Sequence, residues 1–388
     1  MSIIKFNQLL NQHTGKLLGL GMAWLGRKFY RQWHDDKNEI AQKPFPAPVP
    51  PFTQWPSRPH VSLLVAAWNE EAYLEGFLDS FANLGYPNKE LILVAGGSDK
   101  TVELAQKWAG PQIKVLQQIP GEGKFNALHR NLSQASGSVI LLTDADCLLT
   151  SAHVERLIYP IISGKAQATT GPFRPLSSTQ FAHPFIWVQW ATISYSHRSF
   201  GSTQPYVPFM IGPNCAITRS LLEVCWAGID RAPIELDRHL ALSAQRMGQQ
   251  ILYVKGSDVN TDYHASLHRY IMQRSRWHRT SAILHYEFGD RRWIRIIQNS
   301  IKSTVMLCLL LLPLLLGPVG VVICILLWAR SFRRYLHALL YFHRDEQSKL
   351  SSRHLWAAFK LMIADFIAWA IVLVQIAVPK WRTHWRLD

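Results

Sequence analysis

Two short strings in this sequence carry residue types that suit chemistry on a diphosphate. TDADC at residues 143–147 places two carboxylates one residue apart, and QRSRW at 273–277 places two arginines beside a tryptophan. Divalent cations such as Mg²⁺ prefer oxygen ligands and combine protein carboxylates with substrate phosphates. Arginine pairs with phosphate oxygens. Together the strings indicate a metal site and a cationic clamp on a departing diphosphate.

Asp144 and Asp146 follow apolar residues that predict a strand over 138–146. Alternate residues of a strand share a face, so both carboxylates are expected to point into one crevice. A D-x-D pair is frequent by chance and also suits a solvated turn. The apolar run before this pair favours the metal site.

Lys124 lies at the start of a helix expected after a loop that contains Gly121 and Gly123. Backbone amides and a lysine at a helix N-terminus can contact phosphate. The spacing of a P-loop is absent, so this string alone is a weak indication. Asp237 lies in a helix predicted over 233–248. It is either a helix-start carboxylate stabilised by the macrodipole or a general base.

Gln273, Arg276 and Trp277 share one side of a helix predicted over 263–286, at positions i, i+3 and i+4. Arg276 suits phosphate oxygens, and Trp277 suits a stacking wall. The alternative is an amphipathic basic helix on a membrane surface, because apolar segments follow it.

The elements that must position these residues alternate between buried strands and helices. Such alternation predicts an α/β fold with a parallel sheet and right-handed crossovers. Ligands on such sheets bind at the carboxyl ends of the strands, where NEE, GGSD, GEGK and DAD all fall. The strands are expected at 61–68, 90–95, 113–118 and 138–146.

The net charge of +15 lies at the two ends of the chain. Residues 291–388 carry a net +10 and residues 1–45 a net +4, which leaves +1 for residues 46–290. A nucleic-acid binder should show a basic face on its folded domain. Basic residues beside apolar segments instead indicate contact with anionic lipid headgroups, so we expect a membrane partner and no nucleic acid.

Two C-terminal segments, 304–329 and 356–378, are apolar enough to enter a membrane. Because the loop between them is basic, we favour a hairpin or re-entrant segment that turns at Gly317–Pro318 and returns to the cytoplasm. Near the other end, 16–33 predicts a helix lying in the membrane surface or packed on the protein's own core. The expected organisation is a membrane-surface helix region over 1–42, a Pro-rich linker over 43–58, a catalytic domain over 59–290 and membrane-associated helices over 291–388.

These strings, in this order, resemble glycosyltransferase family 2, the inverting GT-A enzymes with C-terminal membrane segments. Cellulose synthase, hyaluronan synthase and ceramide glucosyltransferase belong to this group. The resemblance covers about residues 60–285. Its landmarks are AAWNEE (66–71), GGSD (96–99), GKFNAL (123–128), TDADC (143–147), IGPN (211–214), LDRHL (236–240) and QRSRW (273–277).

The resemblance implies a donor site for a nucleotide-sugar. Glu70 is implied to lie near the uracil and ribose of a UDP-sugar, and Lys124 to contact the nucleotide. Asp144 is implied to lie near the ribose and sugar, and Asp146 to hold Mg²⁺ or Mn²⁺ on the diphosphate.

The resemblance also implies the residues of the reaction and of the acceptor site. Asp237 is implied to be the base for an in-line attack that inverts the anomeric carbon. Gln273, Arg276 and Trp277 are implied to hold the diphosphate and the acceptor.

Two strings depart from the family pattern. The usual Asp-Asp-Gly-Ser after the second strand is Ala95-Gly96-Gly97-Ser98, so a carboxylate that contacts uracil is missing. The usual Glu-Asp pair at the base is Leu236-Asp237. The recognition of the donor's base is therefore the feature that the resemblance defines least.

We expect a GT-A domain with C-terminal membrane helices that moves a single sugar, from UDP-hexose, to a lipid or other hydrophobic acceptor. The catalytic domain is expected to face the cytoplasm at a bacterial inner membrane. A lipid is favoured because polymer-secreting relatives carry several membrane spans. The alternatives are a processive polysaccharide synthase subunit and a non-catalytic membrane scaffold.

Overall fold

The computed structural model describes residues 3–41, 48–201, 203–227, 229, 232–345 and 350–378. Its contacts divide the chain into two units. The sheet unit comprises residues 44–180 and 199–263, and the helical unit comprises residues 1–43, 181–198 and 264–388. The catalytic domain expected over 59–290 thus includes two stretches, 181–198 and 264–290, that group with the helices.

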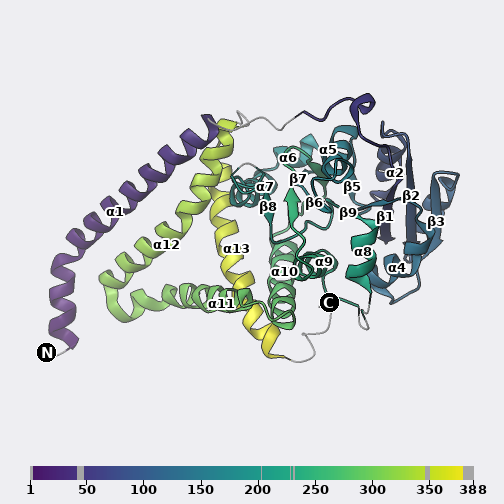
Figure 1. The fold of residues 1–388 in the computed structure, drawn as a ribbon. Coiled ribbons are helices and arrows are strands. Elements are labelled where there is room, and N and C mark those ends of the chain that lie inside the picture. Colours follow the sequence, from purple (N-terminus) through teal and green to yellow (C-terminus); the bar gives the residue numbers. More distant parts are fainter. Residues whose placement is uncertain are drawn as a thin grey trace. The chain divides into compact units, whose positions relative to one another are not determined.

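The sheet unit is built on an eight-stranded sheet in the order β3-β2-β1-β4-β9-β6-β10-β8 (Figure 1). The first four strands in this order are parallel, which confirms the α/β expectation. The strand β9 runs antiparallel to both of its neighbours. The strands are β1 Val61–Trp68, β2 Lys89–Gly96, β3 Ile113–Gln117, β4 Val139–Leu142, β6 Ala168–Thr170, β8 Tyr206–Val207, β9 Cys215–Thr218 and β10 Ile251–Tyr253.

Helices cover both faces of this sheet. Most residues of its central strands are apolar and buried, whichever face they point to. Leu63 and Val65 of β1 belong to one hydrophobic core, and Leu64 between them belongs to the other. Burial on both faces is the usual state of a parallel sheet. The helices of the sheet unit are α2 Leu74–Ala82, α3 Thr101–Lys107, α4 Gly123–Asn131, α5 Ser151–Ile162, α8 Arg219–Trp226 and α9 Leu236–Arg246, with short turns η1 Phe52–Gln54 and η2 Leu132–Gln134.

A small second sheet, in the order β5-β11-β7, begins directly after the D-x-D string. It contains β5 Cys147–Leu148, β7 Phe173–Pro175 and β11 Val259–Thr261. The prediction of a strand through residue 146 is wrong, because β4 ends at Leu142. The chain must leave one sheet and pair with another within a few residues, so both aspartates lie in the turn between them.

Part of the predicted Pro-rich linker belongs to the folded sheet unit. Trp55 is buried in a hydrophobic core, and its indole nitrogen donates to the carbonyl of Pro50 at 2.8 Å. Its ring packs against Tyr86 and Tyr159. Residues 42–47, the start of the predicted linker, lie outside the described residues.

The helical unit consists of long helices that pack on one another. The helix α1 contacts α12, α13 contacts both α10 and α11, and α7 contacts α12 and α13. Two segments, Arg292–Asp345 and Ser352–Ala377, are long and apolar enough to cross a membrane. The helices are α1 Ile3–Ala41, α7 Pro184–Ser196, α10 Leu267–Glu287, α11 Arg292–Cys308, α12 Leu312–Asp345 and α13 Ser352–Ala377, with η3 Leu309–Leu311 before α12; the short α6 Ser178–Ala182 lies at the boundary of the units.

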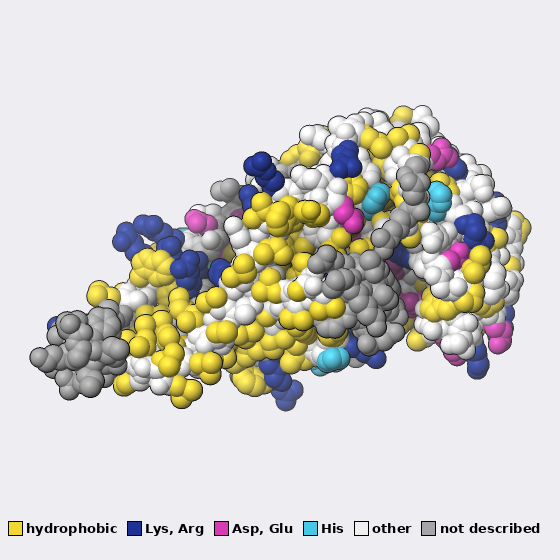
Figure 2. Space-filling model, turned by 90° about the horizontal axis from the view of Figure 1, so that it is seen from below, with side chains coloured by type: hydrophobic (Ala, Val, Ile, Leu, Met, Phe, Trp, Pro, Cys, Tyr) yellow, Lys and Arg dark blue, Asp and Glu magenta, His cyan; other side chains and the backbone are white. Residues whose placement is uncertain are grey.

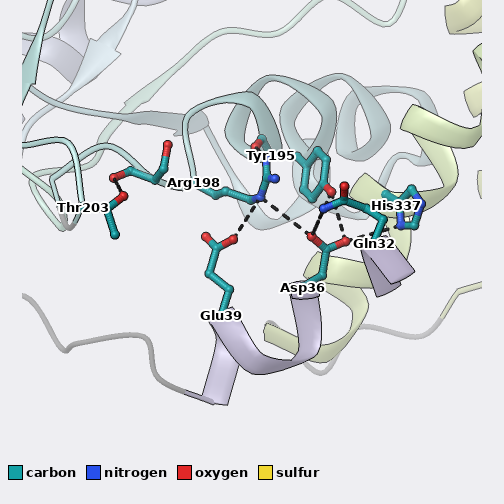
Figure 3. Close-up of polar contacts among 8 residues, drawn as sticks. Gln32, Asp36, Glu39, Tyr195, Arg198, Thr203 and His337 are labelled. Atoms are coloured by element: carbon teal, nitrogen blue, oxygen red, sulfur yellow. Dashed lines mark hydrogen bonds and ion pairs between the residues drawn. The ribbon is translucent and has the colours of Figure 1, made fainter. Parts of the chain in front are cut away.

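The N-terminal helix α1 packs along α12 within the helical unit. A Cβ at Gly21 would lie 2.6 Å from the side chain of Leu326, so the two helices touch closely there. Farther along, the buried carboxylate of Asp36 accepts hydrogen bonds from Tyr195 of α7 and from Gln32 (Figure 3). Paired buried polar groups of this kind fix one arrangement of helices.

Candidate active site

The carboxylate of Asp144 forms an ion pair with the ammonium group of Lys124. Lys124 lies in the first turn of α4, and Asp144 lies in the turn after β4, so both reach the carboxyl edge of the parallel strands. Burial works to lower the pKa of Lys124, but the adjacent Asp144 carboxylate outweighs it and raises the pKa to about 12. The ammonium group therefore stays charged at the place where the D-x-D string meets the helix start.

Asp146 lies at the entrance to the second sheet, where β5 and β11 hold it. The hydroxyl of Thr261 donates to its carboxylate at 3.4 Å, and the thiol of Cys147 lies 3.6 Å from the same oxygen. Burial and the neighbouring charges of Asp144 and Asp262 raise the pKa of Asp146 to about 6. A carboxylate surrounded by like charges is a favourable ligand for a cation, which would offset the repulsion.

Asp262 and Tyr73 complete this acidic group and were not singled out from the sequence. Asp262 follows β11 directly and accepts a hydrogen bond from Gln180 at 2.5 Å. Burial, and then the charge of Asp262, raise the pKa of Tyr73 to about 12. The sequence gives little indication that Asp262 belongs to the site, because only the pairing of β11 with β5 brings it near Asp146.

Asp237 lies in the first turn of α9, where a carboxylate is favoured by the helix dipole. The backbone amide of Gly212 donates to its Oδ2 at 3.0 Å. Its negative charge also acts on Lys124 and on Cys215 of β9. The structure therefore brings Lys124, Asp144 and Asp237 into one electrostatic neighbourhood within the sheet unit.

The loop that carries Gly212 is held by the fully buried Asn214. Its side-chain amide donates to the carbonyls of Pro172 and Ser257, both at 2.6 Å, and its carbonyl oxygen lies 2.9 Å from His153 Nε2. The side chain of Thr143, next to the D-x-D pair, donates to the carbonyl of Pro213 at 2.8 Å. The IGPN string thus joins the D-x-D turn to Asp237 of α9, a role that its sequence did not specify.

The ends of β1 and β2 are joined by a second set of hydrogen bonds. Asn69, which has a left-handed φ of 58°, accepts from the amide of Ser98 at 2.7 Å. Gly97 must lack a side chain, because its Cβ would lie 2.2 Å from the Asn69 oxygen. The backbone of Glu70 is held by the hydroxyl of Thr101 at 2.7 Å. This loop therefore presents Glu70 at the same sheet edge as Asp144.

Trp68 explains why the GGSD string has a glycine at position 96, where the family pattern has an aspartate. Gly96 pairs in register with Trp68, and a Cβ at Gly96 would lie 2.7 Å from the indole ring. It would also lie 2.8 Å from Cβ of Gln118, so an aspartate does not fit beside the present ring. The glycine and the tryptophan form a matched small and large pair at the end of the strands.

The QRSRW residues lie on α10 in the helical unit. Gln273, Arg276 and Trp277 are all half-buried. It is Arg274 that stacks on Trp277, with its guanidinium carbon 5.5 Å from the ring centroid. Arg274 also lies 3.8 Å from the carboxylate of Asp365 on α13. Of the predicted clamp residues, Trp277 is thus linked through Arg274 to the apolar helix α13.

Asp146 remains the residue best suited to hold a divalent cation. Within the described residues, no group of three His, Cys, Asp or Glu side chains is arranged to enclose a metal ion. Sites for Mg²⁺ commonly rely on few carboxylates and take the remaining ligands from substrate phosphates and water. The D-x-D turn fits that kind of open site.

Comparison with known proteins agrees with this fold. A mannosyltransferase from Pyrobaculum calidifontis has a similar structure with a TM-score of 0.53 and 16% sequence identity. The match covers 94% of this chain and 99% of the mannosyltransferase. The sheet unit therefore has the GT-A fold of glycosyltransferases.

Residues 62–226 match the model of the family described as Glycosyl transferase family 2. This stretch, which makes up most of the sheet unit, is therefore similar to glycosyltransferase family 2. This range includes the β1 end, Lys124, the D-x-D turn and the IGPN loop. Asp237 and the QRSRW string lie beyond it.

Curated relatives match only part of their length. The probable glycosyltransferase YdaM of Bacillus subtilis is 26% identical over 242 residues, which is 59% of this chain and 57% of YdaM. A beta-monoglucosyldiacylglycerol synthase of Trichormus variabilis is 39% identical over 142 residues, covering 34% of this chain and 26% of the relative. A poly-beta-1,6-N-acetyl-D-glucosamine synthase of Staphylococcus epidermidis is 30% identical over 112 residues, covering 28% and 27%.

Proposed function

We propose that this protein is a membrane-associated, inverting glycosyltransferase that moves a single hexose from a UDP-sugar to a lipid acceptor. The observation that carries the proposal is the convergence of Lys124, Asp144 and Asp237 at the carboxyl edge of a family 2 domain. A cation, a D-x-D turn and a separate carboxylate supply the three charges that sugar transfer from a diphosphate needs.

In this proposal each residue has one task. Asp146 holds a divalent cation, which when bound neutralises charge on the leaving diphosphate. Lys124 and Asp144 orient the nucleotide end of the donor, and Glu70 lies nearer its base and ribose. Asp237 accepts the proton of the attacking acceptor hydroxyl, and direct displacement at the anomeric carbon inverts its configuration.

Gln273, Arg276 and Trp277 are proposed to hold the diphosphate and the acceptor. Two observations support this role: Trp277 is stacked by Arg274, and α10 packs against the apolar helix α13. Arginine binds phosphate oxygens, and an aromatic ring packs on the apolar face of a sugar.

A lipid acceptor is favoured by the two apolar segments and by the relative that is a glycolipid synthase. The competing candidate is a subunit of a processive polysaccharide synthase, which the Staphylococcus relative favours. The sheet unit is proposed to face the cytoplasm, where nucleotide-sugars are made.

The direct test is a transfer assay with detergent-purified protein, Mg²⁺ or Mn²⁺, and a panel of UDP- and GDP-sugars. The GDP-sugars are included because the mannosyltransferase was solved with GDP-mannose and Mn²⁺. Mass spectrometry of lipid extracts, from cells with and without the gene, identifies a glycolipid product. A product that grows by repeated sugar addition would instead support the polymer synthase.

Substitutions separate the proposed enzyme from a non-catalytic scaffold. Asp237→Asn should abolish transfer while nucleotide binding persists, and Asp146→Ala should remove the metal dependence of donor binding. Asp79→Asn, on the exposed side of α2, is the matched control and should behave as wild type. Retained turnover in Asp237→Asn would remove the base assignment, and absence of turnover with every donor would favour the scaffold.

A further inference from the structure

We propose that residues 303–329 form a re-entrant hairpin, which enters the lipid bilayer from one side and leaves on that side. The tip of this hairpin, residues 314–318, lies within the hydrocarbon core and does not reach the opposite headgroups. The inference deepens the membrane placement of the proposed function and rests on it. It follows from the break at Gly317, the lengths of the two arms, the exposed tip and the charges at both ends.

The break at Gly317 turns the chain back on itself. Its φ of 52° and ψ of −135° interrupt the helix in a conformation that favours glycine, and Pro318 lacks a backbone N–H. A Cβ at Gly320 would lie 2.4 Å from the carbonyl oxygen of Leu312, so the two arms meet closely after the turn. The thiol of Cys324 also contacts the carbonyl of Leu309. The segment is therefore a hairpin.

Both uncharged arms are too short to cross a bilayer. Residues 303–316 extend about 21 Å and residues 318–329 about 18 Å, at a helical rise of about 1.5 Å per residue. The hydrocarbon core is about 30 Å thick. A hairpin whose charged ends stay at one surface therefore reaches only part of the way across.

The tip has no residue suited to the opposite headgroup layer. Leu314 is 82% exposed and Leu315 is 73% exposed, and no charged residue lies between Lys302 and Arg330. Figure 2 shows apolar side chains gathered over part of the face seen, with Lys and Arg side chains beside them. Exposed leucines at a turn are unfavourable in water or among headgroups and favourable in acyl chains.

At the turn Gly317 is half-buried and Pro318 is exposed, and the second arm packs on the first directly afterwards. Val319 is only 3% exposed, and Gly320 packs against the backbone of Leu312 and Pro313. Because Pro318 has no backbone N–H, its exposed position leaves no donor unpaired in lipid.

Basic residues lie at both ends of the hairpin. Arg295 and Lys302 precede the first arm, and Arg330 and Arg333 follow the second, with no acidic residue in 291–302 or 330–334. Anionic headgroups on one leaflet match both groups at once. A single crossing would place one cationic group on each side, against the positive-inside tendency.

On the neighbouring helix α1, Trp24 lies beside Arg330, the residue that follows the second arm. The guanidinium of Arg330 lies 5.8 Å from the centroid of the Trp24 ring on α1, and the ammonium of Lys28 lies 4.3 Å from it. Tryptophan and basic residues together are typical of the boundary between headgroups and acyl chains. The second arm therefore leaves the hydrocarbon near Arg330.

The depth of the tip is tested with the substitution Leu315→Cys, in full-length protein whose native cysteines are replaced by serine. A fluorophore on the introduced cysteine is read in vesicles of phosphatidylethanolamine and phosphatidylglycerol. Lipids spin-labelled deep in the acyl chains should quench it, and iodide in the water should not. Quenching by iodide would overturn the proposal.

Sidedness is tested in intact cells and in inverted membrane vesicles with a membrane-impermeant maleimide. The Leu315→Cys variant should react from neither side, and a Ser351→Cys variant should react only from the cytoplasmic side. Reaction of the tip cysteine from outside would show that the hairpin crosses fully. Reaction of the Ser351→Cys variant from outside would show a single crossing, and either result overturns the re-entrant arrangement.

A charge at the tip gives an independent measure. Leu315→Arg should lower the affinity for the same vesicles at least tenfold, whereas Val224→Arg, at an exposed position of α8, should not. Equal affinity of the two variants would contradict insertion of the tip. If the wild type does not bind vesicles at all, the membrane placement of the proposed function fails instead.

Discussion

The backbone amide of Gly212 donates a hydrogen bond of 3.0 Å to Oδ2 of Asp237. This contact joins a loop that Asn214 holds in place to the first turn of α9. It fixes one carboxylate oxygen, Oδ2, of the proposed base. The geometry of the base thus depends on residues that are distant from it in the sequence.

Gly212→Ala should lower the transfer rate at least tenfold, with little change in folding. A Cβ at Gly212 would lie 3.2 Å from Asp237 Oδ2, so the carboxylate must move by a few tenths of an ångström. Initial rates and thermal unfolding would be compared with Gly110→Ala, where the nearest atom to the added Cβ is 4.0 Å away. An unchanged rate would show that this hydrogen bond does not position the base.

Gly96→Ala should destabilise the sheet unit, because its Cβ would lie 2.7 Å from the ring of Trp68. Overpacking of this kind typically costs about 1–3 kcal/mol. Adding Trp68→Ala should restore part of the lost stability, and the double-mutant cycle measures that coupling. Additive effects of the two substitutions would mean that the residues are not a matched pair.

Glu90→Gln should remove a stabilising contribution that depends on pH. Burial alone would raise the pKa of Glu90, but hydrogen bonds from Ser136 and Ser62 lower it from 4.5 to about 2. The folded-state pKa lies below the unfolded value. The contribution, on the order of 3 kcal/mol, is therefore complete above about pH 4.5 and lost as the pH falls toward 2.

Unfolding of wild type and Glu90→Gln between pH 7 and pH 3 measures this contribution. The difference in stability between them should shrink as the pH falls. The exposed Glu75 provides the control, since Glu75→Gln should leave the pH dependence of the wild type intact. A constant difference between wild type and Glu90→Gln would contradict the role of this carboxylate.

Asp36→Ala should loosen α1 from the helices that it contacts. The hydroxyl of Tyr195 donates to Asp36 at 2.9 Å, and His337 Nδ1 lies 3.3 Å from the same carboxylate (Figure 3). Removing a buried acceptor leaves these groups unpaired at a cost of about 1–3 kcal/mol. Limited proteolysis of α1 should become several-fold faster, but not in Asp35→Ala, which removes an exposed neighbour. Unchanged proteolysis of Asp36→Ala would exclude the docking role.

Local patterns predicted the central elements well. The apolar run 61–68 is β1 as expected, and the runs at 90–95 and 113–118 form β2 and β3 with bounds that differ by a residue or so. Such runs are informative because a strand buried on both faces has few alternatives. The end of β4 was missed, because the turn into the second sheet depends on pairing between Cys147 and Thr261, which are far apart in the sequence.

The sequence by itself determined the parallel sheet, the family strings and the apolar segments, because each of these is written in neighbouring residues. Only the tertiary structure decided that Asp262 lies near Asp146, that Trp68 takes the space beside Gly96, and that Gly212 holds Asp237. These are long-range contacts, which depend on how strands and helices pack and leave no periodic trace in the chain. A charged residue of the site can therefore be recognised from the sequence. Its neighbours, and with them its chemistry, follow only from the fold.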